Sequence, residues 1–78
     1  MRVQLRFFAS LRERLGPGEV RTVRPGTTAG SLWESLVRAQ PTIASVRIRI
    51  AVNERYVDPG HELADGDEVA FFPPVSGG

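Results

Sequence analysis

One segment of this 78-residue chain has the pattern of a long helix, and that segment limits which folds are open to the rest. Its apolar residues recur on one side of a helix: Leu32, Trp33, Leu36 and Val37. Thr27 or Thr28 can cap its N-terminus, and Pro41 ends it at about Gln40. Because this is the only long helix that the sequence predicts, its apolar side needs a sheet to cover it.

The other regular segments show the two-residue alternation of strands. We expect strands at residues 2–8, 19–24, 46–52, 56–57 and 68–72. Ser10 to Glu13 fits the capping-box pattern S-x-x-E and predicts a short helical connector, and Asn53-Glu54 predicts a hairpin tip. The order strand, strand, helix, strand, short strand, strand predicts an α+β fold. It would be a ubiquitin-like β-grasp over residues 1–74, followed by a tail at 75–78.

Composition excludes several kinds of site. The chain contains no cysteine, no lysine and a single histidine, His61. It therefore has no thiolate nucleophile, no zinc-thiolate site, no lysine for a Schiff base and no histidine metal cluster. We expect no metal site, no permanently bound cofactor and no self-sufficient enzyme.

Charge and hydropathy indicate which partners and which cell compartment to expect. The net charge is +1 and the arginines are spread along the chain, which does not indicate nucleic-acid binding. No apolar run approaches the ~20 residues that span a membrane, and charges interrupt the N-terminal apolar run, which is untypical of a signal peptide. We expect a cytoplasmic protein.

Strand parity places aromatic side chains on the sheet face away from the helix. If Phe7 and Phe71 face the helix, Phe8 and Phe72 lie on the opposite face, and Tyr56 is a candidate to join them. Four arginines are expected around them: Arg2, Arg6, Arg47 and Arg49. An exposed aromatic cluster with a charged rim is typical of a protein-docking surface. The alternative is that Phe8 packs under the short helix and Phe72 under a loop.

The last residues, Val75-Ser76-Gly77-Gly78, follow a stiff Pro73-Pro74 pair. Four residues can extend ~13–14 Å, and two glycines without Cβ atoms are thin enough for a narrow channel. The reactive group is the carboxylate of Gly78, which ATP can convert to an acyl-adenylate and sulfur can convert to a thiocarboxylate. The alternative is a frayed tail with no role.

Residues 65–78, DGDEVAFFPPVSGG, resemble the C-terminus of the small subunit of molybdopterin synthase, the MoaD family. The segments Phe7-Phe8-Ala9 and Ala51-Val52-Asn53 resemble that family as well. The resemblance implies a β-grasp sulfur carrier. In that family an E1-like, MoeB-like enzyme adenylates the terminal glycine, here Gly78, with ATP, and a sulfur donor protein converts it to a thiocarboxylate.

The resemblance also implies a MoaE-like large subunit, with a heterotetramer as the assembly. The tail would enter its active-site pocket and donate sulfur to cyclic pyranopterin monophosphate in molybdenum cofactor biosynthesis. The candidate catalytic residues are then Gly77 and Gly78. The candidate docking residues are Phe8, Tyr56, Phe72, Pro73, Pro74 and Val75.

Three other functions stay open. A carrier of the same chemistry can serve thiamin thiazole synthesis or tRNA thiolation. A ubiquitin-like modifier would join Gly78 to lysines of other proteins. A non-covalent binding module would make no use of the tail.

Overall fold

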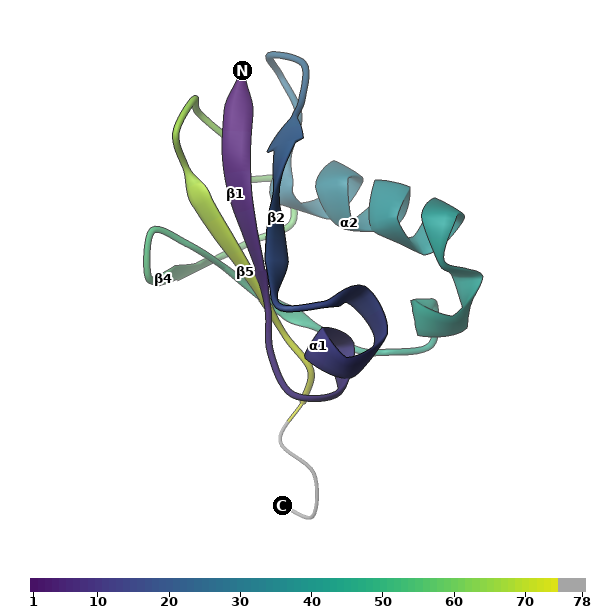
Figure 1. Cartoon of the computed structure of the whole chain (residues 1–78). Coiled ribbons are helices and arrows are strands. Elements are labelled where there is room, and N and C mark those ends of the chain that lie inside the picture. Colours follow the sequence, from purple (N-terminus) through teal and green to yellow (C-terminus); the bar gives the residue numbers. More distant parts are fainter. Residues whose placement is uncertain (75–78) are drawn as a thin grey trace.

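The computed structural model describes residues 1–74 of the chain, and its sheet is mixed (Figure 1). In chain order the elements are β1 (Arg2–Phe7), α1 (Ser10–Leu15), β2 (Gly18–Thr22), α2 (Ala29–Ala39), the 3-10 helix η1 (Pro41–Ile43), β3 (Arg49–Val52), β4 (Arg55–Val57) and β5 (Glu68–Phe72). The strand order is β2-β1-β5-β3-β4, and β1 runs parallel to β5 while the other neighbours are antiparallel. The predicted α+β fold, a β-grasp sheet on one main helix, is confirmed.

The core lies between the sheet and α2. Its side chains come from alternate strand positions and from the apolar side of the helix, and the largest fully buried ones are Phe7, Phe71, Leu5, Leu11, Leu32, Ile43, Val3 and Val69. Trp33 of α2 packs against Phe71, with ring centroids 5.5 Å apart. No helix within residues 1–74 has the length and apolar character needed to cross a bilayer.

The N-terminus of α2 settles which threonine caps the helix. Thr28 Oγ1 accepts from the Ser31 N–H at 3.1 Å, and Ser31 Oγ accepts from the Thr28 N–H at 2.9 Å. This reciprocal pair satisfies two donors that a helix start leaves open. Helix α2 ends at Ala39, and Pro41 opens the 3-10 helix, close to the predicted end.

The predicted capping box of the short helix is wrong. Ser10 is the first residue inside α1, and Ala9 takes the N-cap position with φ 52° and no side-chain hydrogen bond. The Leu11 and Arg12 N–H groups bond to the Phe8 and Ala9 carbonyls instead. The left-handed turn at Ala9 starts the helix directly after β1, so that Ser10 lies inside it.

Three strands are shorter than predicted, and β2 and β3 are so because their partners end. Strand β2 stops at Thr22. The last hydrogen bond between the two strands joins the Val23 N–H to the Met1 carbonyl, and beyond it no residue is left to pair with β2. Strand β3 begins at Arg49, opposite Phe72, the last residue of β5. Residues 46–48 therefore lie in a connection, although Val46 and Ile48 still pack on the core. Strand β1 ends at Phe7, one residue early.

The hairpin between β3 and β4 turns at Asn53 and Glu54, with φ of 51° and 70°. Positive φ at both central residues is what a two-residue hairpin with a type I′ turn requires, and Asn tolerates that conformation. The Asn53 side chain donates to Asp67 at 2.9 Å and accepts from the Glu68 N–H at 3.0 Å. The hairpin is thereby tied to the start of β5.

Candidate functional site

The sheet face opposite α2 carries two aromatic rings in contact. Phe7 pairs with Phe71 across β1 and β5, so the next residues, Phe8 and Phe72, are neighbours on the outer face. Their rings are stacked at 4.6 Å between centroids and 11° between planes. We expected both side chains to be exposed or nearly so, and both are half-buried, because each ring covers a face of the other. Phe8 thus packs on Phe72, and the alternative of Phe8 under the short helix is wrong.

Tyr56 completes the aromatic group. It is 60% exposed on β4 and meets Phe72 edge-on, with centroids 6.1 Å apart and planes at 69°. Its opposite residue on β3 is Ala51, which in turn pairs with Ala70 on β5. These two small residues are buried beside the rings, and we call them the floor of the surface. We call Phe8, Tyr56 and Phe72, together with Arg6 and Arg49, the aromatic cluster.

Two of the four expected arginines lie on the rings. The Arg6 guanidinium carbon is 5.7 Å from the Phe8 centroid, and that of Arg49 is 4.0 Å from the Tyr56 centroid. Such contacts stabilise exposed sites by ~0.5–1 kcal/mol each. Arg2 lies toward the other end of β1, where its N–H bonds to Asp65. The described residues give neither Arg2 nor Arg47 a ring contact.

The aromatic cluster is suited to binding. Ring stacking and the cation–π contacts already hold its side chains, so a partner would lose less conformational entropy on ordering them. Arg6 also pairs with Glu68 at 3.7 Å, but both side chains are about half exposed and the pair is weak. Arg49 has no acidic partner among residues 1–74. A complementary surface would be apolar, with a carboxylate opposite Arg49.

The cluster lies at the end of β5, where the tail begins. Phe72 is the last strand residue, Pro73 is half-buried and Pro74 is exposed. The candidate residues Val75, Gly77 and Gly78 lie outside the described residues. A partner that covers the cluster therefore also meets the start of the tail at Pro73.

A groove of about 930 Å³ lies between α2 and the β3–β4 hairpin, and Tyr56 and Arg49 form part of its wall. Its polar lining includes Glu34, Asp58 and His61. Across residues 1–74 no group of three or more His, Asp or Glu side chains could hold a metal ion.

Sequence reasoning missed the floor of the surface. Ala51 lies at an outward position of β3, beside Ala70, and each is less than a tenth exposed. A small residue at an outward position of a central strand was the available signal. The ring contacts of Arg6 and Arg49 had no such signal, because they depend on side-chain conformations.

Comparison with known proteins gives a consistent result. The protein-family model described as "ThiS family" matches residues 5–78. The molybdopterin synthase sulfur carrier subunit of Escherichia coli (strain K12) is 35% identical over 97% of this chain and 99% of that protein. Small archaeal modifier protein 1 of Haloferax volcanii is 34% identical over 97% of this chain and 100% of that protein.

Solved structures share the fold. The crystal structure of SAMP1 from Haloferax volcanii matches with a TM-score of 0.84 and 32% identity, and covers 100% of both chains. A chain in the complex of subunits 1 and 2 of molybdopterin-converting factor from Helicobacter pylori 26695 matches with a TM-score of 0.70 and 26% identity, again over 100% of both chains.

Proposed function

This chain belongs to the ThiS family, and on that premise we propose that it is the sulfur carrier subunit of a molybdopterin synthase. The observation that carries the proposal is the match to sulfur carrier subunits along almost the whole chain. The family match extends to Gly78, the residue that would carry the sulfur. ATP-dependent activation of Gly78 fits a cytoplasmic location.

The proposed chemistry takes place at the Gly78 carboxylate. Its oxygen attacks the α-phosphorus of ATP in the active site of an adenylating enzyme, and pyrophosphate leaves. Sulfide-level sulfur delivered by a sulfur donor protein then attacks the acyl carbon and displaces AMP, which yields a thiocarboxylate. Sulfur passes from there to cyclic pyranopterin monophosphate in the large subunit. A chain without cysteine has no thiol of its own to compete for the activated carboxyl group.

The large subunit is the partner proposed for the aromatic cluster. The Helicobacter pylori complex contains a second subunit, which supports an assembly of two kinds of subunit. Docking on Phe8, Tyr56 and Phe72 would bring Pro73 and Pro74 to the mouth of the partner's pocket. The body of the chain would then aim Gly77 and Gly78, and the catalytic groups would belong to the large subunit.

Intact mass spectrometry tests the carrier chemistry. The protein is incubated with ATP, a MoeB-like adenylating enzyme and a sulfur source, and we expect the mass increase of one oxygen-to-sulfur exchange. The Gly78 deletion variant is the matched control and should keep its mass. An unchanged mass of the full chain, with an enzyme that activates a known carrier, would refute the proposal.

A second candidate function rests on one relative. Small archaeal modifier protein 1 is 34% identical to this chain, so attachment of Gly78 to lysines of other proteins is the alternative. It would produce isopeptide-linked conjugates in place of a free thiocarboxylate. Mass spectrometry of tryptic digests distinguishes the two, because a conjugate leaves a branched peptide on the target lysine.

A further inference from the structure

Strand β2 forms one edge of the sheet (Figure 1). Two backbone hydrogen bonds lie at the two ends of its pairing with β1. The Phe7 N–H donates to the Pro17 carbonyl at 3.1 Å, and the Val23 N–H donates to the Met1 carbonyl at 2.8 Å. Bonded and non-bonded positions alternate in an antiparallel ladder. The N–H and C=O groups that point away from β1 therefore belong to Gly18, Val20 and Thr22. The described residues supply no hydrogen-bond partner for these groups.

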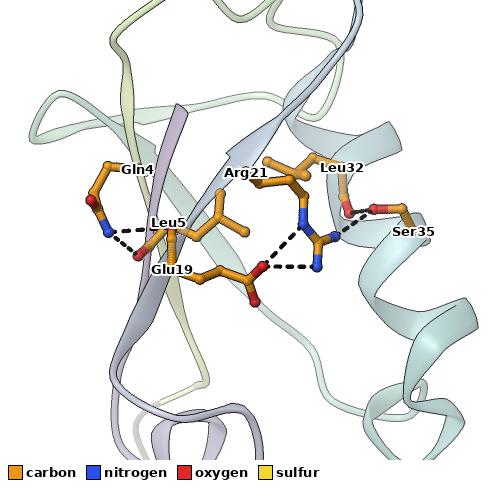
Figure 2. A network of polar contacts seen from close by, with 6 residues as sticks. All are labelled: Gln4, Leu5, Glu19, Arg21, Leu32 and Ser35. Carbon is orange, nitrogen blue, oxygen red and sulfur yellow. Dashed lines mark hydrogen bonds and ion pairs between the residues drawn. The ribbon is translucent and has the colours of Figure 1, made fainter. Parts of the chain in front are cut away.

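The side chains of this edge alternate between the two faces. Val20 is 51% exposed on the outer face. Glu19 and Arg21 lie on the helix side, where Arg21 Nε and Nη2 donate to Glu19 Oε2 at 3.2 and 3.1 Å (Figure 2). Arg21 also contacts Ser35 of α2 through its third nitrogen at 3.4 Å. The charged side chains are thus held beside the free edge.

Charges on an edge strand usually prevent pairing with another strand. Here their arrangement has the opposite effect for one geometry. In an antiparallel pair of two β2 strands centred on Val20, each Glu19 lies opposite Arg21 of the second copy. Opposite charges in such cross-strand pairs attract, and the two Val20 side chains meet on the outer face.

We propose that β2 is a self-association edge, through which two copies of this chain form a symmetric antiparallel dimer. Val20 exchanges both backbone hydrogen bonds with Val20 of the second copy, and Gly18 does so with Thr22. The two sheets become one continuous sheet across a two-fold axis. The three rings of the aromatic cluster lie on β4, on β5 and directly after β1, and Arg6 is the one cluster residue that pairs with a β2 residue, Gly18. The dimer therefore leaves the rings of the proposed docking surface open.

The dimer should be weak. One pair of short strands buries less than the roughly 1,200 Å² at the lower limit of stable interfaces. Its formation therefore has to be followed up to about 1 mM protein. At that concentration we expect the weight-average mass in sedimentation equilibrium to rise toward that of a dimer. The amide signals of Gly18, Val20 and Thr22 should shift together with concentration.

Charge reversal separates self-association from effects on folding. Glu19→Arg places arginines opposite arginines, and Arg21→Glu places glutamates opposite glutamates, so neither variant should dimerise alone. Both variants lose the Glu19–Arg21 pair within the chain. In an equimolar mixture of the two variants, opposite charges face each other between the copies but not within either chain, and the mixture should associate. The double variant Glu19→Arg/Arg21→Glu should associate as well. Circular dichroism confirms that each variant is folded.

Two further results decide the proposal. Val20→Lys, at an exposed position, should abolish association. This variant provides the test if either charge variant fails to fold. Phe72→Ala should leave association unchanged. Wild-type protein that stays monomeric to 1 mM, a mixture that does not associate, or association that depends on Phe72 and not on Val20 would each overturn it.

Discussion

Two adjacent phenylalanines have opposite surroundings, and they separate folding from docking. Phe71 is fully buried and packs on Phe7 and Trp33, whereas Phe72 lies on the outer face against Phe8 and Tyr56. Phe71→Ala should lower the free energy of unfolding by ~3–5 kcal/mol, because it leaves a cavity in the core. Phe72→Ala removes the centre of the aromatic cluster.

At equal folded fraction, Phe72→Ala should weaken binding to the large subunit by ~2 kcal/mol or more, about 30-fold, because aromatic anchors dominate interfaces. Isothermal titration calorimetry measures the affinity, and urea unfolding gives the folded fraction. Val20→Ala is the matched control, since it shortens another apolar residue of the outer face away from the cluster. Normal binding by Phe72→Ala would show that the docking surface lies elsewhere.

Helix α2 depends on its N-cap. Thr28→Ala removes the acceptor for the Ser31 N–H and should lower the free energy of unfolding by ~1 kcal/mol. Urea denaturation measures the loss. Thr27→Ala is the control, because the Thr27 backbone bonds to Arg24 and Leu63 persist in it and its hydroxyl has no hydrogen bond within residues 1–74. If both variants lose stability equally, the capping box does not account for the effect.

Elements were predictable where the cause was local. Strand β5 has the predicted bounds because turn residues precede it and Pro73 ends it, and α2 begins after a threonine that was already a candidate cap. The ends of β2 and β3 were not predictable, because each ends where a strand distant in sequence runs out of residues. The predicted cap of α1 was wrong for a similar reason, because the turn at Ala9 is set by the way the chain leaves β1.

The candidate site was likewise predictable where the cause is local and not predictable where it depends on strand pairing. Parity along β1 and β5 was enough to place Phe8 and Phe72 on one face, because alternation is a property of each strand alone. Their stacking needs the parallel register that sets Phe7 opposite Phe71. The position of Arg49 over Tyr56 needs the β3–β4 hairpin, and neither pairing is written in a local pattern.

In the whole molecule, the core and the proposed reactive group occupy separate parts of the chain. Within residues 1–74, the buried core cluster runs from Val3 to Phe71. Removal of Gly78 should therefore change the free energy of unfolding by less than ~0.5 kcal/mol, as is usual for changes away from a core. Binding to the large subunit should also persist, because the aromatic cluster stays intact.

Sulfur transfer should nevertheless be abolished in the Gly78 deletion variant. The shortened chain still ends in a carboxylate, that of Gly77, but this carboxylate would lie one residue, about 3.3–3.6 Å, short of the reacting position in the activating enzyme and again in the large subunit. The measurement is single-turnover formation of molybdopterin with the large subunit, after treatment with the activating enzyme. Gly78→Ala, which keeps the length and adds a Cβ, is the companion variant and should retain more activity than the deletion. A deletion variant that transfers sulfur as fast as the full chain would show that reach does not govern the reaction.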